Sequence, residues 1–223
     1  MTVREEQVSG DKVILCFGDS NTHGTVAMDS VMDRRRFSKN QRWPNVMATE
    51  LDSGWEVIAE GHPGRTAVFD DPVEGAHKNG LTVLPSLLET HRPIDLVIVL
   101  LGTNDTKARF SANAFDIAKA LERVVRAINS SDAGPDCRAP RVLLAAPVPV
   151  VETGPIAPMF EGAAAKARAL GPLLAQAAAR CGAGFIDLAS VAEVDPTDGV
   201  HLSAGSQAAI GRAMAETVRA MFS

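Results

Sequence analysis

The stretch VILCFGDSNTHG, residues 13–24, decides the fold and the position of the candidate site. Its first five residues are all apolar, which is typical of a strand that is buried on both faces of a parallel sheet. Gly18 ends this run, and Asp19 and Ser20 follow directly. Sites in open α/β sheets form beyond the carboxyl ends of the strands, so Ser20 is a candidate reactive side chain. A lone serine in this position more often caps a helix or a turn, so the interpretation depends on other polar groups of the chain.

The composition is that of a globular protein. Of the 223 residues, 46% are apolar, which is enough to bury a sizeable core. This length suits a single α/β domain over residues 1–223, and the polar residues 1–11 are expected to form a flexible tail.

Charge and hydropathy argue against nucleic acid and membranes as partners. The net charge is −5, and the short basic run at residues 34–36 lies in a polar loop, where we expect a solvated face. No stretch approaches the roughly 18 consecutive apolar residues of a membrane-spanning helix. The N-terminus lacks an apolar signal region, and the three cysteines are widely spaced. These features predict a cytoplasmic protein with reduced thiols.

Strand and helix patterns alternate along the chain. Such alternation favours a parallel sheet that is covered by helices on both faces. The long polar loop at residues 25–41 is expected to be functional, to contact another subunit or to be disordered. The expected strands are 13–17, 56–59, 95–101, 141–146 and 184–187, and the expected helices are 43–51, 81–91, 114–129, 162–181 and 203–222.

Four polar clusters close four of these segments. The carboxyl ends of parallel strands lie on the same edge of a sheet, so groups that are far apart in sequence can converge there. The clusters are residues 18–20, 61–64, 102–105 and 198–201.

Together the clusters contain the groups that acyl transfer requires. A serine hydroxyl is a poor nucleophile until a base takes its proton, and His201 can be that base for Ser20. An aspartate must hold the imidazole in one tautomer and stabilise its cation. Asp198 lies three residues before the histidine, although Asp195 is close enough to compete for this role.

The oxyanion of the tetrahedral intermediate also needs fixed hydrogen-bond donors. The side-chain amide of Asn104 can be one donor, and the backbone N–H groups of Ser20 and Gly64 can be the others. Loss of one such donor typically costs about 10²–10³ in rate, so Asn104 is expected to matter greatly.

Neighbouring residues have weaker functional interpretations. His23 and His62 flank two clusters and are candidate substrate-binding residues, although ordinary loop histidines are more common. Asp19 is expected to accept hydrogen bonds from nearby backbone N–H groups. Asp105 and Arg65 are expected to form a buried ion pair that braces the site. No two histidines have metal-ligand spacing, so no metal site is predicted.

In sequence order, the four clusters resemble the four blocks of the SGNH (GDSL-type) hydrolase superfamily. Each block alone is a weak signal, whereas four blocks in the correct order are a strong one. The blocks are matched by Gly18-Asp19-Ser20, by Gly64, by Gly102-Thr103-Asn104-Asp105 and by Asp198-Gly199-Val200-His201.

A closer similarity is to the arylesterase/acyltransferase branch of this superfamily, carried by LCFGDS, HRPIDLVIVLLGTNDTK and DGVHLS. The resemblance implies that Ser20 is the nucleophile, His201 the base and Asp198 its partner. It implies an oxyanion hole of Ser20, Gly64 and Asn104. It also implies a flavodoxin-like three-layer α/β/α sandwich with a five-stranded parallel sheet, no metal or organic cofactor, and assembly into homo-oligomers.

We therefore predict a serine esterase that hydrolyses short-chain or aryl carboxylic esters, its small-molecule substrates, through an acyl-enzyme. Acyl transfer to other acceptors is a second activity to be tested. A carbohydrate O-deacetylase is the alternative enzymatic interpretation. A catalytically silent small-ligand-binding protein is a third, against which the complete Ser, Asn, Asp and His set argues. Asn21 stands where the first block usually has leucine, which leaves the acyl pocket and the balance between hydrolysis and transfer open.

Overall fold

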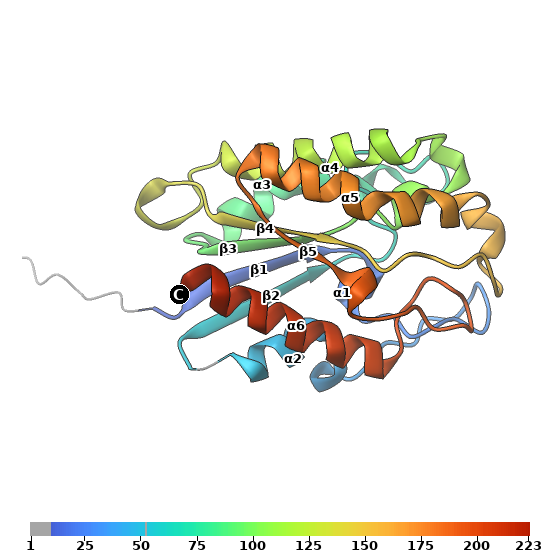
Figure 1. The fold of residues 1–223 in the computed structure, drawn as a ribbon, viewed down its shortest axis with the longest axis horizontal. Coiled ribbons are helices and arrows are strands. Elements are labelled where there is room, and N and C mark those ends of the chain that lie inside the picture. Colours follow the sequence, from blue (N-terminus) through green and yellow to red (C-terminus); the bar gives the residue numbers. More distant parts are fainter. Residues whose placement is uncertain (1–9, 52) are drawn as a thin grey trace, which may run out of the picture.

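Parallel strands form the central sheet of the protein. The computed structural model describes residues 10–51 and 53–223, so the tail predicted for residues 1–11 lies almost entirely outside the described residues. In the described part the sheet has five strands in the order β2-β1-β3-β4-β5, and all neighbouring strands are parallel (Figure 1). This order is flavodoxin-like, and it confirms the predicted sheet. The strands are β1 (Lys12–Gly18), β2 (Trp55–Gly61), β3 (Leu96–Leu100), β4 (Arg141–Ala146) and β5 (Gly184–Asp187).

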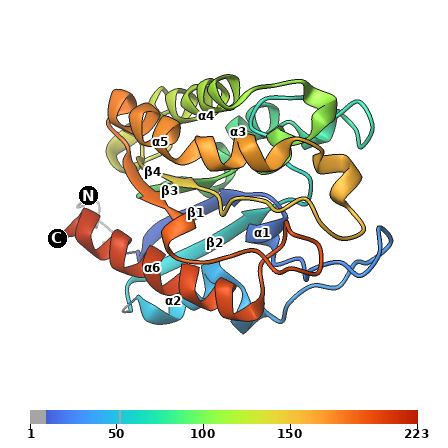
Figure 2. The same ribbon diagram turned by 45° about the vertical axis from the view of Figure 1, so that its right-hand side comes forward.

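Helices cover both faces of the sheet, as the two ribbon views show (Figures 1 and 2). One layer contains α2 (Trp43–Glu50) and α6 (Ala204–Phe222), and the other contains α3 (Gly80–His91), α4 (Ala114–Asn129) and α5 (Ala163–Cys181). The predicted three-layer α/β/α sandwich is thus confirmed. None of the helices in the described ranges is long and apolar enough to cross a membrane.

The strands separate two hydrophobic cores. In β1, Leu15 and Phe17 belong to the core under α3, α4 and α5, whereas Ile14 and Cys16 belong to the core under α2 and α6. All four side chains are fully buried. Burial on both faces is the physical reason for the uninterrupted apolar run at the start of the chain.

The predicted helices are present, with boundaries that differ by no more than one residue. Ser203, predicted inside the last helix, is instead the N-cap of α6, because its Oγ accepts a hydrogen bond from the backbone N–H of Ser206 at 3.1 Å. The second strand is longer than predicted, because Gly61 still pairs with Gly18 of β1.

A short helix that the sequence did not predict, α1 (Ser20–His23), begins directly at Ser20. Asp19 caps it, with Oδ1 accepting from the backbone N–H of Asn21 at 2.9 Å. A helix of four residues is too short to show helical periodicity. The turn from β1 into α1 is so tight that a Cβ at Gly18 would lie 2.0 Å from Oγ1 of Thr22. The Gly-Asp-Ser sequence is therefore a strand-to-helix turn with no room for a side chain at its first position.

Candidate active site

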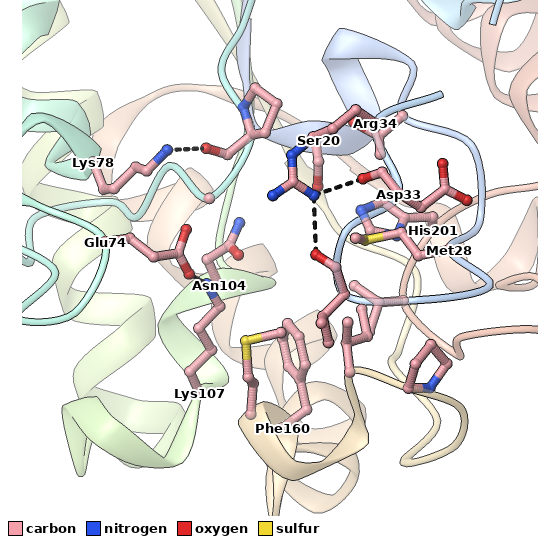
Figure 3. A pocket seen from close by; sticks show the side chains of 18 of the residues that line it. Ser20, Met28, Asp33, Arg34, Glu74, Lys78, Asn104, Lys107, Phe160 and His201 are labelled. Carbon is pink, nitrogen blue, oxygen red and sulfur yellow. Dashed lines mark hydrogen bonds and ion pairs between the residues drawn. The ribbon is translucent and has the colours of Figure 1, made fainter. Parts of the chain in front are cut away.

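Ser20 lies at the carboxyl edge of the sheet and lines a cavity of about 620 Å³. Gly64, Asn104 and His201, which come from three other segments of the chain, line the same cavity. Figure 3 shows Asn104 and His201 at its wall. The structure thus brings members of all four polar clusters together. Ser20 is only 6% exposed, and its hydroxyl forms no hydrogen bond with any described residue. Because a hydroxyl can rotate, its proton can be directed toward His201 or toward a ligand.

The loop that follows the fifth strand holds a carboxylate against an imidazole. Nδ1 of His201 lies 2.5 Å from Oδ2 of Asp198, and both side chains are buried. Oδ1 of the carboxylate accepts from the backbone N–H groups of Val200 and His201, at 3.0 and 2.9 Å. Oδ2 also accepts from the backbone N–H of Met28, at 2.8 Å. The contact at Nδ1 leaves the opposite ring nitrogen of His201 available for proton transfer.

The environment of Asp198 favours its charged form. Burial alone raises the pKa of this carboxyl, but the hydrogen bond and charge of His201 and the surrounding N–H donors lower it to about 2. The group is therefore ionised at neutral pH and can stabilise an imidazolium. The competing candidate, Asp195, instead accepts from the backbone N–H of Thr197 at 3.0 Å in its own turn.

Hydrogen-bond donors are available at the same cavity. In the described part of the protein, the backbone N–H groups of Ser20 and Gly64 donate to no protein acceptor. Gly64 has a φ of +81°, a left-handed conformation that favours glycine. The side-chain amide of Asn104 donates to the carbonyl of Arg65 at 3.1 Å and lies 3.4 Å from Oδ2 of Asp19. These contacts fix the orientation of the amide at the cavity wall.

Asp19 and Asp105 form a buried acidic layer beneath the site. Asp19 accepts from Asn21 as predicted, and burial raises its pKa to about 6. Oδ1 of Asp105 accepts from the backbone N–H of Ala67 at 2.9 Å, whereas Oδ2 has no partner among the described residues. Burial raises the pKa of Asp105 to about 7.

The prediction of an ion pair between Arg65 and Asp105 is wrong. The guanidinium of Arg65 instead donates to the carbonyls of Gly18, at 2.9 Å, and of Glu60, and it lies over the ring of Phe17. The backbone carbonyls at the ends of β1 and β2 are nearer to this guanidinium than any carboxylate, so it braces two strand ends. Burial lowers the pKa of Arg65 to about 10, which leaves it charged at neutral pH.

The two candidate substrate-binding histidines lie in different places. His23 lines the cavity, with Nδ1 3.1 Å from Oγ1 of Thr25, and burial together with nearby arginines lowers its pKa to about 4. His62 is not among the lining residues, and its Nε2 lies 3.3 Å from Nζ of Lys78. Burial and the lysine charge lower the pKa of His62 to about 4. Both rings are therefore neutral at pH 7.

Several charged residues of the cavity were not predicted from the sequence. Arg34 and Arg35 are exposed, as predicted for a solvated face, and they also line the cavity. Lys107 and Arg109 also line it, and their position directly after the third polar cluster was a signal that could have identified them. Within the described ranges, no group of three or more His, Cys, Asp or Glu residues has the arrangement of a metal site.

Comparison with known proteins identifies the family. Residues 16–209 match the model of the GDSL-like Lipase/Acylhydrolase family. No curated protein matches the chain. Among solved structures, the native aryl esterase of M. smegmatis is 38% identical with a TM-score of 0.89, over 94% of this chain and 99% of that chain.

Two structures from Sinorhizobium meliloti are similarly close. Est24, a carbohydrate acetylesterase, is 36% identical with a TM-score of 0.90, over 95% of this chain and 100% of that chain. A carbohydrate acetylesterase family member is 38% identical with a TM-score of 0.87, over 94% and 98%. These matches confirm the resemblance read from the four sequence blocks. The chain belongs to the GDSL-like lipase/acylhydrolase family.

Proposed function

We propose that the protein is a serine esterase in which Ser20 is the nucleophile, His201 the general base and Asp198 the residue that positions the base. The observation that carries this proposal is the buried 2.5 Å contact between His201 and Asp198 at the cavity that Ser20 lines. A base held in one tautomer beside a serine with no competing hydrogen bond is what nucleophilic catalysis requires.

The proposed reaction has two stages. The hydroxyl oxygen of Ser20 attacks the ester carbonyl while its proton passes to His201, and Asp198 stabilises the resulting imidazolium. The backbone N–H groups of Ser20 and Gly64 stabilise the oxyanion, and so does one N–H of Asn104, which exchanges its long 3.4 Å contact with Asp19 for the oxyanion. The intermediate collapses to an acyl-enzyme, and the alcohol leaves with the proton from His201. Water activated by the same base then releases the acid and restores Ser20.

The substrate class is supported by the cavity and by the relatives. Apolar side chains from the segment 155–160 line the cavity, which suits a short acyl chain or an aryl group. The similar structures are named as an aryl esterase and as carbohydrate acetylesterases. Hydrolysis of short or aryl esters is therefore the primary proposal, and removal of acetyl groups from carbohydrates is the second. Acyl transfer would follow if an alcohol replaced water at the acyl-enzyme.

Initial rates on p-nitrophenyl esters from acetate to octanoate test the proposal. Ser20→Ala should reduce kcat by at least about 10⁴-fold, because the acyl-enzyme can no longer form. Ser86→Ala, an exposed serine of α3, is the matched control and should retain full activity. Equal rates for the wild type and Ser20→Ala would refute the assignment of Ser20 as the nucleophile. A far higher rate on acetylated sugars than on aryl acetates would favour the second proposal.

We also propose a homo-oligomeric, cytoplasmic protein that folds as one domain and binds neither nucleic acid nor membranes. Support for the assembly comes from large apolar side chains that are exposed around the cavity loops, namely Val31, Met32, Val73 and Val151. Light scattering that gave a monomer mass at working concentration would refute the assembly, and cell fractionation tests the location.

A further inference from the structure

The walls of the cavity carry an excess of positive charge, although the chain as a whole is acidic. The net charge of the chain is −5. Among the residues that line the cavity, five are Lys or Arg and only two are Asp or Glu. The cationic residues are Arg34, Arg35, Lys78, Lys107 and Arg109, and the acidic residues are Asp33 and Glu74.

Three of these cations are neutralised by carboxylates of the protein. Arg35 pairs with Asp29 at 2.5 Å and with Asp33 at 2.6 Å. Lys107 and Arg109 pair with Glu74 and Asp71, which together balance their charges. With Asp29 and Asp33 these make four carboxylates, so the five cations of the cavity keep a net excess of one positive charge. The shortest contacts of these two cations are 2.8 Å from Lys107 to Glu74 and 3.0 Å from Arg109 to Asp71.

The remaining two cations, Arg34 and Lys78, form no ion pair with any carboxylate of the described residues. Nη1 of Arg34 donates to the backbone carbonyls of Val31 and Asp33, at 3.0 and 2.7 Å. Nζ of Lys78 donates to the carbonyl of Pro63 at 2.8 Å. A guanidinium has five N–H donors and an ammonium has three, so both groups retain donors for a ligand.

The unpaired cations lie near the groups that would perform the chemistry. The side chains of Lys78 and Glu74 are both adjacent to Gly64, because a Cβ at that glycine would lie 3.2 Å from Cε of the lysine and 2.7 Å from Oε2 of the glutamate. Figure 3 shows Arg34 on the side of the cavity that holds Ser20 and His201, with Lys78 across from it. Positive charge therefore lies on two sides of the cavity that Ser20 lines.

We propose that the preferred substrates are esters that carry a carboxylate, which Arg34 and Lys78 bind while the apolar segment 155–160 contacts the rest of the molecule. This inference rests on the proposed esterase function. Lys78 is partly buried, so it attracts an anion more strongly than a cation in open water does, whereas Arg34 is exposed. Arg34 can bind a carboxylate through two parallel hydrogen bonds, which a neutral ester cannot provide.

Matched pairs of substrates test this inference and distinguish the two ends of the ester. The first pair compares mono-p-nitrophenyl glutarate, which carries a carboxylate on its acyl chain, with the neutral p-nitrophenyl pentanoate. The second pair compares meta-acetoxybenzoate, which carries a carboxylate on its leaving group, with its neutral methyl ester. Each kcat/KM is divided by the rate constant of alkaline hydrolysis, which removes the intrinsic difference in reactivity. At least one pair should favour the anion by about 10-fold or more at low salt, and less at high salt.

Variants of the two cations should remove this preference. Arg34→Gln and Lys78→Gln should each lower the anionic-to-neutral ratio several-fold, Arg34→Glu should lower it further, and Arg34→Lys should restore part of it. Arg123→Gln removes the same charge from an exposed position on α4 outside the cavity, and it should leave the ratio unchanged. Circular dichroism of each variant confirms that it is folded.

The possible outcomes separate this inference from the proposed function. A wild-type ratio near one for both pairs, or a preference that survives both cation variants, overturns the inference while ester hydrolysis stands. Equal rates for the wild type and Ser20→Ala on the neutral esters would instead refute the proposed function. A preference for the anionic substrate of one pair that is lost in both Arg34→Gln and Lys78→Gln supports the inference. The pair that shows the preference tells whether the carboxylate lies on the acyl side or on the leaving group.

Discussion

The two sides of the cavity are built in different ways. On the reacting side, Asp198 is completely buried, and backbone N–H groups fix both of its oxygens. On the loop side, Arg35 pairs with carboxylates of the loop 25–41, and the side chains of Arg35 and Asp29 are 56% and 70% exposed. The sheet edge therefore determines where chemistry can occur, whereas the exposed side chains of the loops can vary in sequence and alter what is bound.

The largest effect is expected on the reacting side, from Asp198→Asn. This change removes the charge that stabilises the imidazolium and permits the wrong tautomer, so kcat should fall by about 10³–10⁴-fold. Steady-state kinetics on a p-nitrophenyl ester measures it. Asp195→Asn is the matched control, since that carboxylate accepts a hydrogen bond from the backbone N–H of Thr197 in its own turn. Equal losses in the two variants would contradict the assignment of Asp198.

Asn104→Ala should have the next largest effect. Loss of one oxyanion donor is expected to reduce kcat by about 10²–10³-fold, with a smaller change in KM, because the donor acts mainly in the transition state. A variant that raised KM at unchanged kcat would show that Asn104 contributes only to substrate binding.

A stability effect should follow from the buried carboxyl of Asp105. In the unfolded chain this group ionises near its ordinary pKa of about 3.9, whereas in the folded protein it retains its proton up to about pH 7. The unfolded chain therefore releases the proton first, and stability falls as the pH rises between these two values. Asp105→Asn keeps an acceptor for Ala67 and removes the ionisation.

The free energy of unfolding measures this effect. Relative to the wild type, Asp105→Asn should gain up to about 3 kcal/mol between roughly pH 5 and pH 8. Asp116→Asn, an exposed residue of α4, serves as the control. A difference that did not change with pH would show that Asp105 is ionised in the folded protein.

The smallest effect is expected on the loop side, from Asp33→Asn. This change weakens the contact with Arg35, whose side chain is 56% exposed against 9% for Asp33. Asn keeps an oxygen acceptor for the backbone N–H of Arg35, so Tm should shift by no more than about 2 °C. Differential scanning calorimetry measures it. A large loss of stability would show that the loop side of the cavity is held as firmly as the reacting side.

The sequence predicted the fold well because burial on both faces of β1 and β3 leaves uninterrupted apolar runs at 13–17 and 96–100. It also predicted which clusters would meet, since parallel strands place their carboxyl ends on one edge. It did not predict the partners of Arg65. These are backbone carbonyls, which every residue has, so the sequence does not indicate which of them a guanidinium will contact. It correctly placed Arg34 and Arg35 on a solvated face, but it did not predict that they also line the cavity, because the path of a long loop depends on contacts that no periodicity encodes.

The hydrogen bond from the backbone N–H of Met28 to Oδ2 of Asp198 has a consequence for protein engineering. That oxygen also contacts the imidazole, so a displacement of the loop 25–41 alters the environment of the proton acceptor itself. Libraries that redesign this loop for a new substrate should therefore change turnover as well as affinity. Grafts that preserve the backbone at Met28 and vary only the positions beyond it should retain the highest proportion of active clones.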